Sequence, residues 1–306
     1  MAGSGIPQRD LSPSDRSEPS QTEPGRKLEP GLYLVATPIG NLEDLTRRAG
    51  RVLATADLLV CEDRRVTGRL LQHLGLHRPL GLYHEHNAAA ARPELLARLR
   101  DGASVALVSD AGTPAISDPG YKLVRDAVAQ GSTVFPVPGP SAVLAALVAS
   151  GLPTDRFLFQ GFLPARSAAR QRVLEELAVV PATLVMFESP QRLGEMLADA
   201  ATVLGPRAAV VARELTKLFE EHRRGSLPEL AAAYAAGGPP KGEVVVVIAP
   251  PAATAGKLDD ATVDQLLREA LRSDKPRVAA AAVAAATGRT ANELYRRALT
   301  LGRSGG

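Results

Sequence analysis

Short apolar runs that alternate with amphipathic stretches dominate the chain from Leu32 onward. The first half contains five of them: LYLVAT (32–37), DLLVC (57–61), PLGLY (79–83), SVALVS (104–109) and STVFPV (132–137). Residues 45–54, 64–74, 93–100 and 122–130, which separate these runs, have the periodicity and length of helices. Because a helix that links two strands returns the chain to the same edge of a sheet, the alternation predicts a parallel β-sheet covered by helices.

A second set of apolar runs begins after Gly151. Its members are FLFQGF (157–162), ATLVMFE (182–188), RAAVVAR (207–213) and GEVVVVIAP (242–250). The turn signal GLPTD at residues 151–155 and the changed spacing of the runs predict a domain boundary near residue 150. Since 306 residues exceed one typical domain, we expect an α/β fold with two domains, residues 31–141 and 142–250.

The two ends of the chain differ from this pattern. Residues 1–30 are rich in Ser, Pro, Gly and mixed charge, which predicts a disordered tail, and PPAATAG (250–256) is typical of a linker. The segment 258–300 is predicted to be helical, and between Leu271 and Thr300 it has six basic residues against two acidic ones. A capping box at Thr290 and Glu293 and a Gly-containing turn make this extension similar to a helix-turn-helix. Either it binds RNA phosphates, or it is a helical hairpin that packs on its own protein.

Composition excludes several classes of protein. The lone Cys61 rules out an intrachain disulfide and a Cys-rich metal site, and it fits a reducing cytoplasm. No apolar stretch reaches the roughly 18 to 20 residues that span a bilayer. The motifs of P-loop, dinucleotide-binding, zinc-protease and serine-hydrolase sites are missing, so we expect no metal. A pI near 9.2 favours an anionic partner.

Polar and small residues follow four of the five predicted strands in the first half. Ligands of parallel sheets bind where the strands end, because loops and helix N-termini expose unpaired N–H groups there. Each segment alone also fits an ordinary turn or a solvated helix start. The segments are Thr37–Leu42, Cys61–Arg65, Asp110–Gly120 and Pro138–Ser141.

Two charged segments follow predicted strands of the second half. They are Phe187–Arg192 and Arg213–Glu221, and the second equally fits a surface helix with Glu and Lys pairs. Their position suggests that both halves contribute to one cleft.

At these segments the chain resembles the tetrapyrrole methylase superfamily, and within it the enzymes that methylate small-subunit ribosomal RNA. The resemblance covers about residues 31–250. It rests on LYLVATPIGNLEDLTRRA, CEDRRVTGRLL, LVSDAGTPAISDPG, PVPGPSAVLAAL, SGLPTDRFLFQGFLP, FESPQRL, ARELTKLFEE and KGEVVVVIAP. The C-terminal helices also look like the family's small extension.

The resemblance implies two α/β domains with an active-site cleft between them and a homodimer. S-adenosylmethionine (SAM) would be the methyl donor, and the acceptor would be the 2'-hydroxyl of a cytidine of 16S rRNA, at the decoding centre of the small ribosomal subunit. The residues implied to contact SAM are Pro38, Gly40, Asp110, Gly112, Thr113, Pro114, Ser141, Met186 and Phe187.

The implied catalytic residues are Glu62, Asp63, Arg65 and Lys217. We expect Glu62 or Asp63 to accept the hydroxyl proton, while Arg65 and Lys217 hold the phosphate or ribose. Two positions depart from the family's usual motifs: Arg64 replaces a Thr, and Gln191 replaces a His.

Two other functions fit the same fold. One is a methyltransferase acting on a tetrapyrrole carbon, which the CEDRR and ELTK segments and the basic extension disfavour. The other is a non-catalytic RNA-binding factor, which the intact strand-exit loops disfavour.

Overall fold

The computed structural model describes residues 27–117, 120–251, 260–272, 274–287 and 289–303. Nearly all of the expected tail (1–30) and most of the expected linker (250–256) lie outside these residues. The chain forms two compact units. The first ends at Ala145 and also includes Leu215–Phe219, and the second consists of Ala146–Glu214 and the chain from Glu220.

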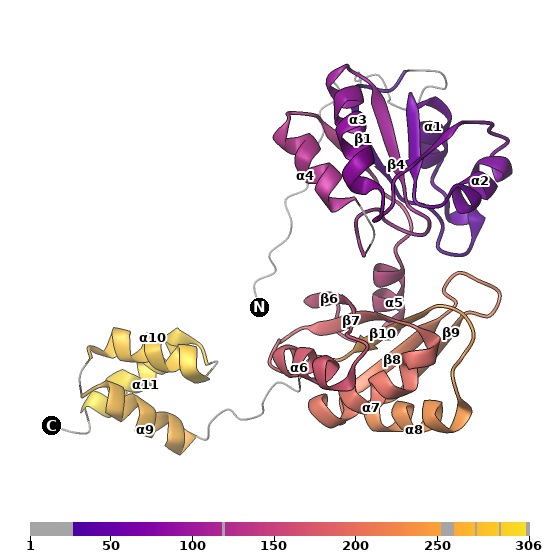
Figure 1. Ribbon diagram of the computed structural model, residues 1–306. Helices are drawn as coiled ribbons and strands as arrows, with labels where there is room; N and C mark the ends of the chain where they lie inside the picture. Colours follow the sequence, from indigo (N-terminus) through magenta and orange to yellow (C-terminus); the bar gives the residue numbers. More distant parts are fainter. Residues whose placement is uncertain (1–26, 118–119, 252–259, 273, 288, 304–306) are drawn as a thin grey trace, which may run out of the picture. The chain divides into compact units, whose positions relative to one another are not determined.

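The first unit contains a parallel sheet with the strand order β3-β2-β4-β1-β5 (Figure 1). All five predicted strands form, with ends that differ from the prediction by no more than two residues. The strands are β1 (Gly31–Val35), β2 (Leu58–Cys61), β3 (Leu80–Leu82), β4 (Ser104–Val108) and β5 (Val134–Val137).

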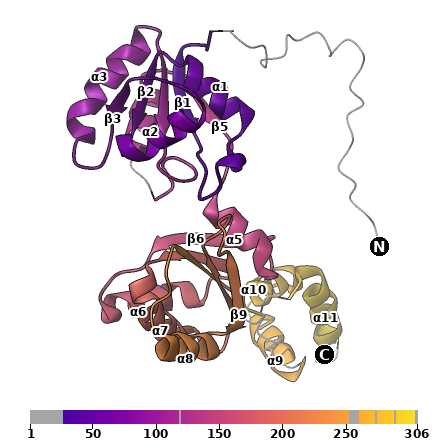
Figure 2. The ribbon, with the colours of Figure 1, turned by 90° about the vertical axis from the view of Figure 1, so that its right-hand side faces the viewer.

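Helices cover both faces of this sheet (Figure 2). Alternate residues of a strand point to opposite faces, so in β4 Ala106 packs toward α1 (Arg47–Thr55) and α2 (Arg64–His73). Leu107, the next residue, packs toward α3 (Ala88–Arg100) and α4 (Tyr121–Ala129). Burial on both faces explains why these strands are continuous apolar runs.

Helix α3 begins earlier than the sequence predicts. The predicted start was Pro93, but the helix begins at Ala88 and Pro93 lies inside it. Four alanines at residues 88–91 favour the helix, and this preference outweighs the one hydrogen bond that the proline nitrogen cannot donate.

The second unit has a mixed sheet with the strand order β6-β7-β10-β8-β9. Strands β6 (Phe157–Phe162) and β7 (Thr183–Glu188) are parallel, whereas β10 (Val244–Ile248) runs antiparallel to β7 and to β8 (Ala208–Arg213). The sequence did not predict β9 (Glu221–Ser226), because its residues EHRRGS lack apolar alternation. This charged strand forms an edge of the sheet, where charge discourages pairing with another chain.

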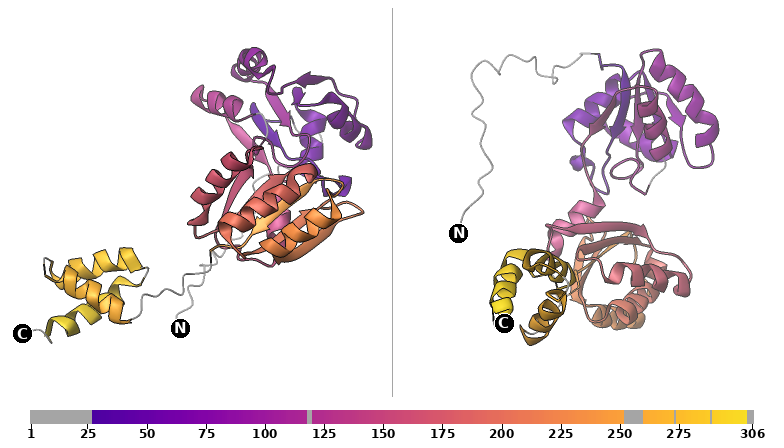
Figure 3. Two further views of the ribbon diagram at one scale, coloured as in Figure 1. Left: turned by 60° about the horizontal axis from the view of Figure 1, so that its bottom comes forward. Right: turned by 90° about the vertical axis from the view of Figure 1, so that its left-hand side faces the viewer.

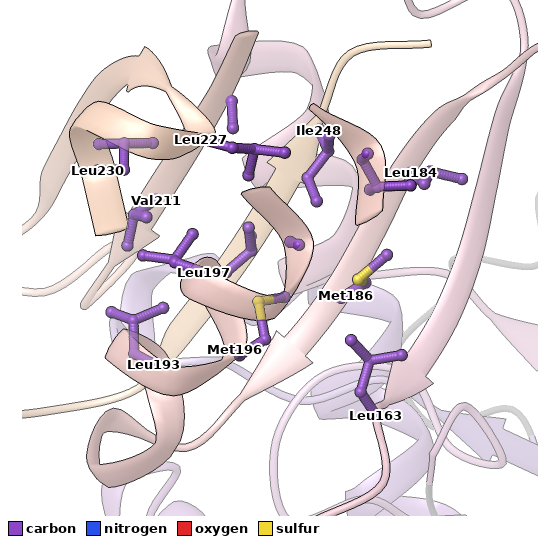
Figure 4. Close-up of a cluster of buried hydrophobic side chains, with 14 of the residues drawn as sticks. Leu163, Leu184, Met186, Leu193, Met196, Leu197, Val211, Leu227, Leu230 and Ile248 are labelled. Atoms are coloured by element: carbon purple, nitrogen blue, oxygen red, sulfur yellow. The ribbon is translucent and has the colours of Figure 1, made fainter. Parts of the chain in front are cut away.

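Helices α6 (Ser167–Ala178), α7 (Leu193–Leu204) and α8 (Leu227–Gly237) pack on one face of the second sheet. In Figure 4, Leu193, Met196 and Leu197 of α7 meet Leu184, Met186, Val211 and Ile248 from the strands. Beside this core, the buried Arg170 of α6 donates to Asp199 of α7 over 2.6 Å. This ion pair fixes the contact between the two helices.

Helix α5 (Ala142–Ser150) follows β5, and the Leu144 N–H donates to the Ser141 hydroxyl over 3.4 Å at its start. Two short 3₁₀ helices, Leu42–Asp44 and Pro190–Arg192, follow β1 and β7. The Asn41 side chain caps the first of them by accepting from the Glu43 N–H over 3.0 Å.

Three C-terminal helices have a hydrophobic core of their own (yellow in Figure 3). They are α9 (Asp260–Ala270), α10 (Pro276–Thr287) and α11 (Ala291–Arg303). Thr290 caps α11 as predicted, since its hydroxyl accepts from the Glu293 N–H over 3.4 Å. Within the described residues, every helix is too short or too polar to cross a membrane.

Candidate functional site

The loop after β4 is hydrogen-bonded to the loop after β1. Thr37 and Gly112 exchange two backbone hydrogen bonds of 3.0 Å each, and the Thr37 hydroxyl donates to the Ser109 carbonyl over 2.9 Å. Thr37 is buried, so these bonds are protected from water. The loops at the exits of β1 and β4 are therefore joined by hydrogen bonds.

The exits of β2 and β5 join the same loop. The Asp63 N–H donates to Oδ1 of Asp110 over 3.1 Å, and the Thr113 hydroxyl donates to the Pro140 carbonyl over 3.3 Å. The structure thus brings together all four strand exits that the sequence singled out in the first half, with the DAGTP segment at their centre.

Unusual backbone conformations occur within the loop after β4. Gly112 is buried with φ +79°, and Ala115 and Ser117 have φ values of 67° and 56°. Such conformations cost non-glycine residues energy and cluster at ligand sites. At the β5 exit, a Cβ added to Gly139 would lie 3.0 Å from the Ala36 Cβ, so the backbone approaches closely there too.

The segment Leu215–Phe219 is a loop between β8 and β9 and belongs to the first unit. The sequence of residues 213–221 also fitted a surface helix, but no helix forms there. A Cβ added to Gly40 would lie 2.9 Å from Lys217 Cε and 2.9 Å from Thr216 Oγ1. Glu214 and Thr216 both have positive φ, 50° and 66°, which indicates a loop held in a defined shape. Lys217 therefore lies at the β1 exit, beside Gly40.

Asp63 and Arg65 form an ion pair at the start of α2. The guanidinium approaches the Asp63 carboxylate to 2.6 Å, and the Arg65 backbone N–H donates to the same carboxylate over 2.7 Å. These bonds from the Arg65 side chain and backbone lower the pKa of Asp63 from 3.8 to about 2. Asp63 is thus an ionised helix cap, which makes it a weak base at neutral pH.

A shallow depression lies at the β2 exit. Its lining residues are Glu62, Asp63, Arg64, Leu82, His84, His86 and Asp110. The two imidazole rings are 6.0 Å apart, and Nδ1 of His84 is buried without a hydrogen-bond partner among the described residues. These histidines are not among the predicted site residues, although HEHN directly after the short β3 is itself a polar strand exit. Within the described residues, no His, Cys, Asp and Glu side chains form a group suited to a metal ion.

Met186 and Phe187, at the end of β7, face opposite sides of the second sheet. Met186 is fully buried, and its side chain packs against the helices of the second unit. Phe187 packs against Phe159 and Phe162, with ring centroids 4.8 and 5.6 Å away.

The FESPQR segment continues from Phe187. Its Glu188 carboxylate is buried and accepts from Ser189 N over 2.7 Å and from Arg192 over 3.1 Å. Arg192 also donates to the Leu163 carbonyl over 2.6 Å, which anchors the chain after β6. Gln191 is exposed.

A parallel sheet with preorganised loops at its carboxyl edge, followed by a mixed sheet, is typical of α/β proteins whose ligands bind at that edge. The chain belongs to the tetrapyrrole (corrin/porphyrin) methylase family, which matches residues 31–231. Residues 257–302 match the family described as the RsmI C-terminal HTH domain. The resemblance to this family and the expected fold class are therefore confirmed.

Among curated relatives, the chain is 54% identical to ribosomal RNA small subunit methyltransferase I of Mesorhizobium japonicum, over 92% of this chain and 96% of the relative. It is 53% identical to the protein of the same name from Xylella fastidiosa strain Temecula1, over 67% of this chain and 75% of the relative. Among solved structures, a cobalt precorrin-4 methyltransferase of cobalamin biosynthesis matches with a TM-score of 0.53 and 20% identity, over 71% of this chain and 94% of that chain. This last likeness concerns the fold alone.

Proposed function

We propose that the chain transfers a methyl group from SAM to the ribose 2'-hydroxyl of a cytidine in 16S rRNA, at the decoding centre. The observation that carries the proposal is the 54% identity to a ribosomal RNA small subunit methyltransferase over 96% of that relative's length. The match of residues 257–302 to the RsmI C-terminal HTH domain supports the ribosomal substrate over a tetrapyrrole.

The β4 exit offers SAM a fixed loop and a carboxylate acceptor. The buried Gly112 and Pro114 form a fixed loop, and Asp110 adds a carboxylate that accepts hydrogen bonds from hydroxyl or ammonium groups. SAM would supply a methyl group already activated by its sulfonium. The proposed contacts in the first unit are Pro38, Gly40, Asp110, Gly112, Thr113, Pro114 and Ser141. At the end of β7 the proposed contacts are Met186 and Phe187.

A ribose hydroxyl is a poor nucleophile at neutral pH, so a base must accept its proton. Of the two carboxylates, Glu62 suits this role better than Asp63. Hydrogen bonds from Arg65 lower the pKa of Asp63 to about 2, which makes its carboxylate a weak base. His84 is a further candidate, because it shares the depression with Glu62 and an imidazole is the commonest general base.

Lys217 and Arg65 are proposed to hold the phosphate or ribose of the target nucleotide. Lys217 lies beside Gly40, and the Arg65 side chain is 86% exposed although it pairs with Asp63. Correct alignment of hydroxyl and methyl group can account for roughly 7 to 11 kcal/mol of the barrier. Holding the nucleotide is therefore worth more than proton removal alone, which contributes on the order of 10² to 10⁴ in rate.

The experiment is a methyl-transfer assay with labelled SAM and three acceptors: small ribosomal subunits that lack the modification, protein-free 16S rRNA and uroporphyrinogen III. The proposal expects label in RNA, with the first two acceptors reporting whether the assembled subunit is needed. Label in uroporphyrinogen would instead favour the tetrapyrrole reaction, and SAM binding without any transfer would favour a non-catalytic factor. We further propose a cytoplasmic homodimer, and sedimentation analysis tests the dimer.

A further inference from the structure

The outer face of α11 carries a distinctive set of exposed side chains. Asn292, Tyr295, Arg296 and Leu299 recur at the spacing of one helix face, and all four are exposed. The opposite face, with Leu294 and Ala298, is buried in the core of the three helices. The outer face therefore contains an aromatic ring and a guanidinium, with no carboxylate among these four residues.

Two neighbouring arginines of α11 have different surroundings. Arg297 turns inward and pairs with Asp264 and Asp260 of α9, the latter over 3.0 Å. Arg296 donates to the Asn292 carbonyl over 3.4 Å, and none of the described acidic residues forms an ion pair with it.

A third arginine, Arg289, also forms ion pairs among the three C-terminal helices. Its side chain is 7% exposed and pairs with Asp260 over 2.7 Å and with Glu293 over 3.3 Å. The carboxylates of Asp260, Glu293 and Asp264 thus pair with Arg289 or Arg297, although those of Asp260 and Glu293 are partly exposed. Neutralising the inner arginines in this way leaves the outer face of α11 with the positive charge of Arg296.

We propose that the outer face of α11 (Asn292, Tyr295, Arg296 and Leu299) binds a single-stranded segment of the ribosomal RNA substrate. Tyr295 stacks on a base and Arg296 neutralises a phosphate, while Asn292 hydrogen-bonds a base edge. The inference rests on the proposed function, which supplies the RNA. An aromatic ring beside a guanidinium is the combination that proteins use for unpaired RNA bases, and the charge of this face complements a polyanion.

The test compares full-length variants in their affinity for a single-stranded oligoribonucleotide with the 16S sequence around the target cytidine. Tyr295→Ala is expected to weaken binding about tenfold, whereas Tyr295→Phe, which keeps the ring, stays near wild type. Arg296→Gln is expected to reduce the slope of log Kd against log salt by about 0.7, the loss of one phosphate contact. Arg268→Gln removes an exposed arginine of α9 that forms no ion pair with described residues, and it serves as the charge-matched control. Thermal unfolding of each variant confirms that the three helices remain folded.

Methylation of small subunits separates this inference from the proposed function. If the wild-type protein methylates small subunits, and Tyr295→Ala and Arg296→Gln raise KM for the subunits with kcat unchanged, the results support both the proposed function and the α11 inference. If wild type methylates them and Tyr295→Ala and Arg296→Gln bind and react like wild type, the α11 inference is wrong and the proposed function stands. Equal losses of RNA affinity in Arg296→Gln and Arg268→Gln would also overturn the α11 inference, because the overall positive charge of the three helices would then explain binding. Altered sedimentation with unchanged RNA affinity would assign the face to a second copy of the chain.

Discussion

The backbone N–H of Asp63 donates to Oδ1 of Asp110 over 3.1 Å, which ties the end of β2 to the end of β4. The same Asp63 uses its carboxylate to cap α2 and to pair with Arg65. The Asp63 backbone N–H thus supports the proposed SAM loop, and its carboxylate supports the first turn of α2. Asp63 is better explained as a positioning residue than as the base, and its neighbour Glu62 remains the candidate for proton removal.

This assignment predicts a specific pH dependence. A carboxyl whose pKa falls from 3.8 to about 2 on folding stabilises the protein above pH 4 and loses that contribution as the pH falls through 2. Asp63 is then ionised throughout the working range, so Asp63→Asn should keep the acidic limb of the pH–kcat profile while Glu62→Gln removes it or lowers kcat on the order of 10² to 10⁴. An acidic limb that disappears in Asp63→Asn alone would contradict the assignment.

Gly112→Ala should weaken SAM binding through backbone strain. The position has φ +79° at the centre of the four exits, and an L-residue there costs about 1 to 2 kcal/mol. Gly75 provides a matched control, because its φ is +67° and a Cβ there meets nothing within 4 Å. Both alanine variants should lose comparable stability in urea unfolding, whereas calorimetric titration should show reduced SAM affinity in Gly112→Ala only. Equal SAM affinities would remove the loop from the proposed site.

Gly40→Ala should impair methyl transfer by displacing Lys217. An added Cβ meets the Lys217 side chain and Thr216 Oγ1, so the lysine must move. If displacement of Lys217 is the cause, Gly40→Ala and Lys217→Ala together should reduce kcat/KM no more than Lys217→Ala does. Gly68→Ala, in α2 with nothing within 4 Å of the new Cβ, should retain wild-type kinetics. Fully additive losses would show that Gly40 acts independently of the lysine.

The buried pair Arg170 and Asp199 should matter for stability rather than for chemistry. Arg170 is 1% exposed, and Asp199 accepts from it, from Ser167 and from Gln171. Burial raises the pKa of Asp199, but these hydrogen bonds together outweigh it and lower the pKa. Asp199→Ala leaves the arginine with the exposed Glu195 carboxylate, 3.6 Å away, as its ion-pair partner and should cost about 3 kcal/mol in urea unfolding. Glu94→Ala, which breaks an exposed pair with Arg98, should cost less than about 1 kcal/mol.

The predictable part of the fold follows from burial. Strands β1, β2 and β4 are buried on both faces and so are visible as apolar runs, and polar exits of parallel strands must meet at one edge. Strand β9 was not predicted because it is a charged strand at the edge of its sheet. The antiparallel pairing of β10 with β7 and β8 was not predictable either, because periodicity does not indicate the direction of a strand. The four exits were predictable as a group.

The finer structure of the site depends on contacts that no local pattern encodes. That Lys217 lies beside Gly40 results from tertiary packing of residues far apart in the chain. The pairing of Asp63 with Arg65 depends on side-chain rotamers, so the sequence left Asp63 and Glu62 equally suited as the base. The sequence offered a signal for His84, since HEHN is a polar exit that follows the predicted strand 79–83.

The central claim concerns the atom that receives the methyl group. Small subunits methylated by the protein with labelled SAM can be digested to nucleosides and analysed by mass spectrometry, together with alkaline hydrolysis, which a 2'-O-methylated linkage resists. The account predicts that the label is recovered as 2'-O-methylcytidine from one site of 16S rRNA. Label on a base, on another nucleoside or on uroporphyrinogen III in place of RNA would contradict it.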